Sequence, residues 1–384
     1  MSAGRFTGCP VSRILATYRV AAPAADIHAF AEALALEQSV EVPARVVRDA
    51  FVAREVVAHV AEVRSSGDVH EVDLALATAT TGRDVAQLVN MLFGNCSLLP
   101  NVELVDAQLP ADLLAAFAGP RFGIAGLRAI TGVRGRALTC AALKPQGLSP
   151  DALATLCYTL ACAGVDLIKD DHGLADQHYS PFAQRVRACQ HALDRAADAT
   201  GRRALYAPSL VGAPRTLAAN AAIARDAGAG ALLVAPALVG LPAFAELVAG
   251  DLGVPVLAHP AFAGATRVAP AFLLGRLFRL LGADAVIFPH AGGRFAYSPG
   301  TCSAIADAAR APWGTLRPAL PVPAGGMSVE RVPELVATYG LDTMLLIGGS
   351  LLLDEARIAE RAGDFVARVQ ECAQPAGAVV EAQS

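Results

Sequence analysis

The chain has 384 residues, which is enough for one large α/β domain and a smaller one. It is 54% hydrophobic and 17% charged with a mean hydropathy of +0.44, yet it contains no run of 18 apolar residues, so we expect no membrane span. The net charge of −4, the lack of a basic run and the few aromatic residues exclude a nucleic-acid-binding surface.

The first part of the chain predicts a small α+β domain over residues 1–118. Residues 12–20 (SRILATYRV) alternate like a half-buried strand, and residues 26–39 have helical periodicity. Two further strands are expected at 54–66 and 69–78, before a helix at 84–94. The β-α-β-β-α-β order is typical of a ferredoxin-like domain.

From about residue 137 onward one unit repeats: a short apolar strand, a loop, and an alanine-rich amphipathic helix. The expected strands are 137–145, 165–171, 204–210, 231–238, 254–262, 284–290, 319–326 and 343–349. Eight strands alternating with helices predict a C-terminal (β/α)8 TIM barrel, which we place at 119–384. An open doubly wound sheet is the alternative.

Local signals support the helix starts and the reduced state of the chain. Ser149-Pro150 and Ser180-Pro181 each place a capping hydroxyl before a proline at the first helical position.

The eight cysteines are scattered without CxxC or zinc spacing, so we expect reduced packing residues. The first ten residues lack the pattern of a signal peptide. We therefore expect a cytoplasmic protein.

The use of lysine marks a candidate site. The chain carries 31 Lys plus Arg, but lysine occurs only at Lys144 and Lys169. Both stand at the C-terminal ends of predicted strands, where the chemistry of a barrel is located. Because arginine serves everywhere else, these two positions indicate a need for a primary amine.

The segment KDDH favours a metal site. Lys169 and Asp171 are two residues apart, so their side chains leave the same face of a strand, and His172 follows where the strand opens. A plain ion pair is one interpretation. The other is a divalent-metal site, in which Lys169 reacts with CO2 to form a carbamate, which arginine cannot do, and Asp171 and His172 complete the ligands.

Other strand ends carry candidate substrate contacts. Lys144 either caps a strand-end carbonyl or moves a proton to or from an enolate. The glycine pairs after the last two strands expose backbone N–H groups to a phosphate, or else form tight turns without a ligand. Two histidines close the fifth and sixth strands, either as core residues or as substrate contacts that face the metal. These glycines and histidines are Gly325, Gly326, Gly348, Gly349, His259 and His290.

Taken together, these motifs resemble the RuBisCO large-chain superfamily. GVDLIKDDHG is similar to its metal-binding pattern Gly-x-Asp-x-x-Lys-Asp-Asp-Glu. In chain order, LKPQGLS, LAHPAFAG, PVPAGGMSVERVPELVATYG and LLIGGS resemble its other barrel motifs. ILATYRV, LALEQS and LFGN resemble its small N-terminal domain. The resemblance therefore covers most of the chain.

The resemblance implies a role for each candidate residue. Lys169 would be the carbamylated lysine and, with Asp171 and His172, would bind Mg2+ or Mn2+. Lys144 would be a catalytic acid or base, and His259 would touch the substrate. The remaining implied contacts are Gly325, Gly326, Gly348 and Gly349 with phosphate, His290 and Arg294 with substrate, and Glu37 and Asn95 with the active site of the other subunit. The protein would be a homodimer or a dimer of dimers.

Departures from the pattern imply a RuBisCO-like protein (form IV) that does not fix CO2. His172 replaces the usual glutamate, which leaves the metal identity open. The loop after strand 284–290 has no lysine to stabilise a carboxylated intermediate. Pro260 stands in place of a phosphate-binding arginine, and Ala324 in place of a serine.

The expected reaction is enolisation of a phosphorylated keto-sugar or sugar acid, with isomerisation as the net result, as for 5-methylthioribulose 1-phosphate. Decarboxylation or C–C hydrolysis of a 3-oxo sugar-acid phosphate of the 3-oxo-isoapionate-4-phosphate type is the runner-up. A 2,3-diketo-5-methylthiopentyl-1-phosphate enolase is a weaker alternative, since those enolases use an N-terminal lysine and this chain has none before Lys144. An inactive binding or regulatory protein is the alternative outside the enzymes.

Overall fold

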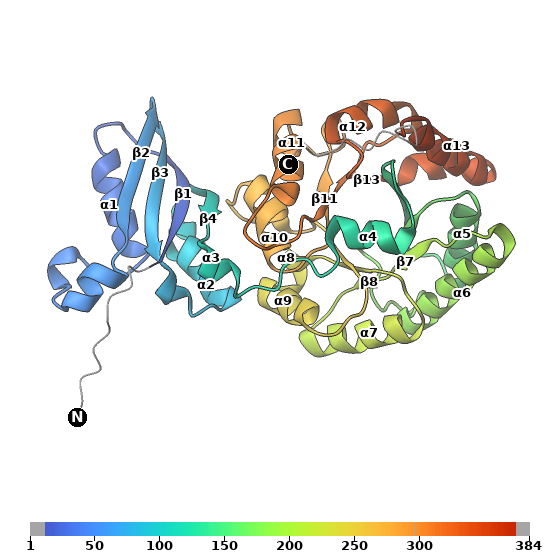
Figure 1. The fold of residues 1–384 in the computed structure, drawn as a ribbon, viewed down its shortest axis with the longest axis horizontal. Helices are drawn as coiled ribbons and strands as arrows, with labels where there is room; N and C mark the ends of the chain where they lie inside the picture. The colour runs from blue at the N-terminus through green and yellow to red at the C-terminus, as the bar shows by residue number, and fades with distance from the viewer. Residues whose placement is uncertain (1–11, 296, 374–384) are drawn as a thin grey trace, which may run out of the picture. The chain divides into compact units, whose positions relative to one another are not determined.

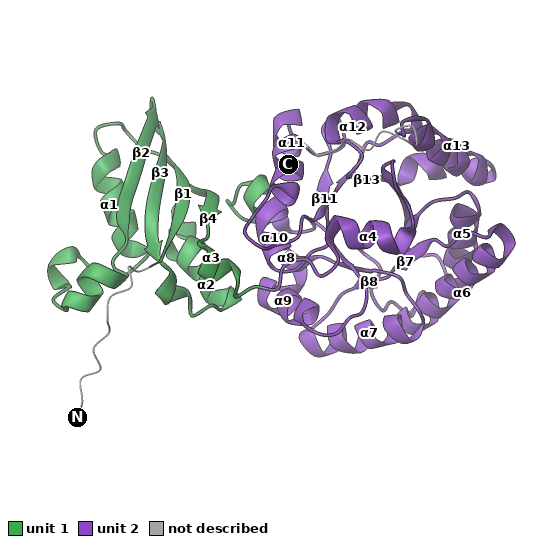
Figure 2. Cartoon of the chain, in the orientation of Figure 1, with its two compact units in different colours: residues 1–117, 264–273 green, residues 118–263, 274–384 purple. Residues whose placement is uncertain are grey.

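The computed structural model describes residues 12–295 and 297–373. The chain divides into two compact units, one of residues 1–117 with 264–273 and one of residues 118–263 with 274–384 (Figure 2). No helix within the described ranges is both long and apolar enough to cross a membrane. Cys9 and the N-terminal stretch on which the signal-peptide expectation rests lie outside the described residues.

Unit 1 is built on a four-stranded antiparallel sheet in the order β2-β3-β1-β4 (Figure 1). Its elements are β1 (Arg13–Ala21), α1 (Ile27–Glu37), β2 (His59–Ser66), β3 (Val69–Ala77), α2 (Val85–Phe93), β4 (Val102–Gln108) and α3 (Ala111–Leu114). This order confirms the ferredoxin-like prediction.

The strand predicted at 54–66 is wrong in its first part. Residues 52–56 form a helical turn, and β2 begins only at His59. The Asp49 carboxylate accepts hydrogen bonds from the N–H groups of Phe51 and Val52, at 2.8 and 3.0 Å. A side chain that caps free N–H groups favours a helical start over an extended one.

The segment 264–273 belongs to unit 1, although it lies far along the chain. Leu104 of β4 donates its N–H to the Arg267 carbonyl and accepts from the N–H of Ala269, at 3.0 and 2.8 Å. Arg267 also donates to the Val102 carbonyl at 3.2 Å. These bonds attach the segment to the free edge of β4, an arrangement that the sequence did not predict.

Unit 2 is a parallel barrel whose strands are surrounded by helices (Figure 1). Its strands are β5 (Leu138–Leu143), β6 (Leu167–Asp170), β7 (Leu205–Ala207), β8 (Ser209–Leu210), β9 (Leu232–Val234), β10 (Val256–Ala258), β11 (Ala285–Pro289), β12 (Leu320–Ala324) and β13 (Met344–Ile347). Its helices are α4 (Gly123–Thr131), α5 (Pro150–Cys162), α6 (Phe182–Thr200), α7 (Pro214–Asp226), α8 (Pro236–Val239), α9 (Leu241–Ala249), α10 (Phe278–Leu280), α11 (Pro299–Arg310), α12 (Val332–Tyr339) and α13 (Ile358–Glu371).

The barrel closes because β7 and β8 are two parts of one strand. β7 pairs with β6, β8 pairs with β9, and only Pro208 separates the two parts. Proline has no N–H to donate to a ladder, so it interrupts the strand. The carbonyl of Pro208 still accepts from Leu233, at 2.9 Å. The barrel of eight strands predicted from the sequence is confirmed.

The period of two along each strand decides which side chains reach the interior. Leu138, Cys140 and Ala142 of β5 and Leu167 of β6 belong to the buried cluster inside the barrel. Residues two apart share a face, so the next inward positions are 144 on one strand and 169 and 171 on the other. Ala142 pairs with Lys169 in the register of β5 and β6. The packing of the core therefore brings Lys144, Lys169 and Asp171 together.

The two predicted caps have different outcomes. The Ser149 hydroxyl accepts from the N–H of Ala152 at 3.2 Å, as predicted. Helix α6 begins two residues after Ser180, and the N–H of Phe182 is bound by the Asp176 carboxylate at 2.7 Å. Asp176 is therefore the capping side chain, and the Ser180 prediction is wrong. The seven described cysteines are free thiols, five of them buried.

Candidate active site

Lys144 and Asp171 form an ion pair at the C-terminal end of β5 and β6. The second oxygen of Asp171 accepts from Gln146 Nε2 at 3.1 Å and from the N–H of Gly173 at 3.0 Å. Burial by itself raises the pKa of Asp171, but the hydrogen bonds from Lys144, Gly173 and Gln146 outweigh it and hold the pKa well below its usual range. Asp171 is thus a carboxylate at all physiological pH values.

Lys169 is buried, with 3% of its surface exposed. Its Nζ donates to the carbonyl oxygen of Asp170 at 2.8 Å, and no carboxylate among the described residues forms an ion pair with it. Burial lowers the pKa of the amine, and the charge of Lys144 acts in the same direction, while Cys140 and Asp171 oppose it. A lowered pKa enlarges the neutral fraction, which is the form that reacts with CO2.

His172 and His259 stack on each other beside Asp171. Their ring centroids are 4.1 Å apart with an interplanar angle of 12°, and His172 Nδ1 lies 3.6 Å from Asp171 Oδ1. The Nδ1 atom of His259 accepts from the N–H of Ala261 at 3.1 Å. Burial, with the charge of Lys169 and the neighbouring His172, lowers the pKa of His259 to about 2. The ring therefore stays neutral, and its proton is on Nε2.

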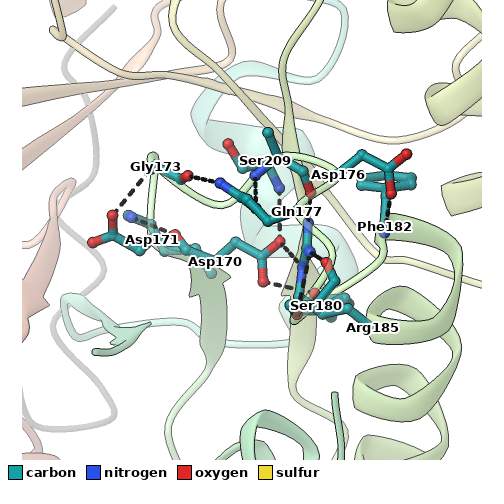
Figure 3. Close-up of polar contacts among 12 residues, drawn as sticks. Asp170, Asp171, Gly173, Asp176, Gln177, Ser180, Phe182, Arg185 and Ser209 are labelled. Atoms are coloured by element: carbon teal, nitrogen blue, oxygen red, sulfur yellow. Dashed lines mark hydrogen bonds and ion pairs between the residues drawn. The ribbon is translucent and has the colours of Figure 1, made fainter. Parts of the chain in front are cut away.

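A buried ion pair supports the other side of strand β6. Figure 3 shows Asp170 and Asp171 directing their carboxylates to opposite sides. Arg185 of α6 donates its Nε–H to Asp170 at 3.0 Å, and both side chains are fully buried. The Tyr206 hydroxyl and the N–H of Ser209 also donate to Asp170, at 2.7 and 3.1 Å. Adjacent residues of a strand point to opposite faces, so Asp170 points toward the surrounding helices while Lys169 points into the barrel. Its pair with Arg185 therefore links β6 to α6.

Arg185 also holds the loop that carries the site. Its guanidinium donates to the carbonyl oxygen of Ser180 at 2.6 Å (Figure 3). It also donates to the carbonyl oxygen of Ala175 at 2.8 Å. Gln177 closes the same loop by donating to the Gly173 carbonyl at 2.7 Å. Arg185 was not among the residues predicted from the sequence, where its only signal is its place among apolar residues in a helix.

The glycine loops after β12 and β13 lie together. Gly325 and Gly326 have φ angles of 85° and 65°, where other residues are strained. A Cβ on Gly325, Gly348 or Gly349 would meet no atom within 4 Å, so their backbone is approachable. Ser350 Oγ donates to the carbonyl of Met327 at 2.7 Å and links the two loops.

His290 differs from the expectation that it faces the metal site. Ala285 and Ile287 point into the barrel, so His290 is out of phase and lies on the helix side of β11. It is 5% exposed; its Nδ1 is 2.7 Å from the Tyr339 hydroxyl, and its Nε2 is 2.9 Å from Arg331 Nη2. Both ring nitrogens therefore have protein partners. Arg331 is a second residue that was not predicted from the sequence.

The three remaining candidates lie on loops and on unit 1. Asn95 donates to the Glu37 carboxylate at 3.0 Å, so the structure brings these two residues together within unit 1. Arg294 is exposed, and its guanidinium lies 5.8 Å from the centre of the Phe295 ring. Their roles in binding stay predictions.

The residues at the barrel mouth fit a metal only in part. Among the described residues, no group of three or more His, Cys, Asp and Glu side chains could hold a metal ion. Asp171 and His172 are two candidate ligands, and the Lys144 ammonium occupies one oxygen of Asp171. A carbamate on Lys169 would supply the third ligand from the same strand face. The donor set therefore fits a divalent cation when Lys169 is carbamylated.

Comparison with known proteins identifies the family of this chain. Residues 123–363 match the family described as "Ribulose bisphosphate carboxylase large chain, catalytic domain". The chain is 52% identical to "Ribulose bisphosphate carboxylase-like protein 1" of Rhodopseudomonas palustris over 93% of this chain and 97% of the relative. It is also 52% identical to "5-methylthioribulose-1-phosphate isomerase" of Rhodospirillum rubrum, over 93% and 96%.

A solved structure supports the same relationship. The crystal structure of a Rubisco-like protein from Rhodopseudomonas palustris superposes with a TM-score of 0.89 at 48% identity, covering 95% of this chain and 100% of that one. The match spans both units and the candidate active site. This chain belongs to the ribulose bisphosphate carboxylase large-chain family and is one of its RuBisCO-like members.

Proposed function

We propose that this protein is a Mg2+-dependent isomerase of 5-methylthioribulose 1-phosphate or a closely similar phosphorylated keto-sugar, acting through an enolate. The observation that carries the proposal is the convergence of Lys144, Lys169 and Asp171 at the barrel mouth beside His172 and His259. The 52% identity to a relative named as that isomerase supports the choice of substrate.

Lys169, Asp171 and His172 would hold the cation, with Mn2+ as the alternative because imidazole is a softer ligand than carboxylate. The bound cation would polarise the substrate carbonyl and stabilise negative charge on its oxygen. CO2 enters as the carbamate on Lys169, and not as a substrate. The buried amine of Lys169, which donates to a carbonyl oxygen and not to a carboxylate, supports this role.

Lys144 would transfer the proton. Its side chain is 38% exposed at the mouth, and Asp171 orients its Nζ. His259 would act differently, since a neutral ring with its proton on Nε2 donates a hydrogen bond but does not exchange a proton at neutral pH. We assign His259 to stabilising the substrate oxygen.

The glycine loops at 325–326 and 348–349 would bind the phosphate through backbone N–H groups. Carboxylation is not part of the proposal, because the loop after β11 has no lysine and Pro260 follows His259. The weaker alternatives are a decarboxylase or C–C hydrolase, a diketone enolase, and an inactive binding protein. The two enzymes would keep the same cation site, and the binding protein would leave it unused.

The test is incubation of 5-methylthioribulose 1-phosphate with the protein, Mg2+ and bicarbonate in D2O. We expect an isomer with an intact carbon skeleton that has taken up one deuterium, detected by mass spectrometry and NMR. Release of CO2 or a shorter acid from a 3-oxo sugar-acid phosphate, with no conversion of the ketose, would instead identify the runner-up. A protein that converts neither substrate contradicts the proposal.

The proposed assembly is a cytoplasmic homodimer in which Glu37 and Asn95 complete the partner's site. As the contact between copies we propose the groove of about 400 Å3 between α7 and α9. Its lining is apolar apart from four exposed charged residues, which are Arg215 and Arg225 of α7 and Glu246 and Asp251 in and after α9. Two-fold symmetry would place Arg215 of one copy opposite Glu246 of the other. The free thiols of the described cysteines support the cytoplasmic location, because the cytosol keeps thiols reduced.

Reversing one charge in this groove is expected to weaken the dimer. Arg215→Glu should raise the dimer dissociation constant by about tenfold, because two carboxylates would then face each other. The double variant Arg215→Glu with Glu246→Arg should restore it. Sedimentation equilibrium measures the constant, and Arg357→Glu, on the exposed side of another helix start, is the control. No change in Arg215→Glu would place the contact elsewhere.

A further inference from the structure

A third glycine pair, Gly292-Gly293, follows β11 and packs against the loop after β12. A Cβ on Gly326 would lie 2.6 Å from the Cα of Gly293, and a Cβ on Gly293 would lie 2.9 Å from the Gly325 carbonyl. Real side chains do not approach so closely, so the two loops meet backbone against backbone. A displacement of either loop must therefore move the other.

Arg331 sits at the junction of these two loops. Its Nη1 donates to the carbonyl of Gly326 at 3.2 Å, and its Nη2 donates to the carbonyl of Ala291 at 3.3 Å. The first bond holds the loop after β12, and the second holds the loop after β11. Glu334, one turn along, orients the same guanidinium at 3.1 Å. One side chain thus ties both loops to the start of α12.

His290 also contacts Arg331 at this junction. Arg331 has only donors, so the Nε2 of His290 must accept its hydrogen bond, which leaves the ring proton on Nδ1. That proton is directed to the Tyr339 hydroxyl. Both ring nitrogens of His290 are therefore hydrogen-bonded to protein groups, and the ring faces away from the barrel interior.

We propose that Arg331 and His290 act as one unit that shapes the loops around Gly326 into the anion-binding site for the substrate's phosphate. Both are positioning residues, and neither touches the ligand. The inference rests on the proposed function, because it places the phosphate at these loops. It replaces a direct contact between His290 and substrate with an indirect effect through the guanidinium.

The test compares Arg331→Met, His290→Leu and the double variant. We expect Arg331→Met to raise the KM for 5-methylthioribulose 1-phosphate by about tenfold with kcat little changed, since the interaction serves binding alone. The dissociation constant of inorganic phosphate, measured by calorimetry, should rise by the same factor. Arg331→Lys should restore part of the affinity, because an ammonium can still donate to one carbonyl.

Non-additivity distinguishes a single unit from two separate contacts. If His290 acts only through Arg331, the double variant should bind phosphate no more weakly than Arg331→Met alone. Additive effects of the two substitutions, or an unchanged phosphate affinity in Arg331→Met, would overturn the proposal. Arg368→Met is the matched control, since Arg368 also pairs with a glutamate three residues on but contacts neither loop.

The outcomes separate this inference from the proposed function. Wild-type protein that binds phosphate in the predicted, Arg331-dependent way but does not convert the ketose would keep the loop assignment and reject the isomerase. Conversion of the ketose by both proteins with equal KM values for wild type and Arg331→Met would keep the isomerase and reject the loop assignment. Wild-type protein that binds no phosphate contradicts the loop assignment.

Discussion

Replacing Lys169 by arginine or methionine is expected to lower kcat by about 10³-fold or more. Neither residue can form a carbamate, so the site loses its third ligand, and a bound cation is worth several kcal/mol of stabilisation to a developing oxyanion. The same variants should lose the stabilisation that saturating Mg2+ gives the wild-type protein. Steady-state kinetics and thermal unfolding with and without Mg2+ and bicarbonate measure the two effects.

Lys144→Met is the matched comparison, because Lys144 is the only other lysine in the chain. It should also lose turnover, since it removes the proposed acid or base. Its stabilisation by Mg2+ should persist, because the Asp171 oxygen that the ammonium occupies becomes free. A Lys169→Arg protein that still responds to Mg2+ with wild-type affinity would argue against a carbamate ligand.

Replacing Arg185 by methionine is expected to destabilise the protein by about 3–5 kcal/mol. The substitution leaves the Asp170 carboxylate buried without its cation, and this is costly even though Tyr206 and Ser209 still donate to it. The loss should shrink as the pH falls toward about 4, because Asp170 is then protonated more readily in the folded state, where burial raises its pKa. Chemical denaturation at several pH values measures the effect.

The double variant Asp170→Asn with Arg185→Met separates charge from packing. It should be more stable than Arg185→Met alone, since no buried charge is left unpaired. Arg357→Met is the control, because Arg357 and Glu360 are half exposed, so water screens their charges and loss of the pair should change the stability little. A single Arg185→Met variant as stable as this control would mean that the buried pair does not secure strand β6.

Much of the barrel could be predicted because the spacing of apolar residues along the chain identifies its strands and helices. The same period of two also predicts the inner face: Leu257 points inward, so His259 does too, whereas His290 is in phase with Phe288 and faces α12. Applying that phase to the sequence would have separated the two histidines. The helical turn at 52–56 was missed because the cap from Asp49 outweighs the strand-like pattern.

The remaining features depend on contacts between distant segments, which no local pattern encodes. Arg185 pairs with Asp170 across a loop, and Arg331 reaches a histidine 41 positions earlier. The segment 264–273 joins β4, more than 150 residues away. Arg331 looks like an ordinary surface arginine in the sequence, and Arg185 differs from one only by its place among apolar residues in a helix. Only the fold shows that they are buried or shared between loops.

The most direct measurement is 13C NMR of the protein equilibrated with 13CO2 and Mg2+. We expect one carbamate resonance that is retained in Lys144→Met, is lost in Lys169→Arg, and grows in parallel with isomerase activity as CO2 is raised. Full activity in CO2-depleted buffer without that resonance would show that catalysis does not need a carbamate on Lys169. A cation site built on that carbamate would then be ruled out.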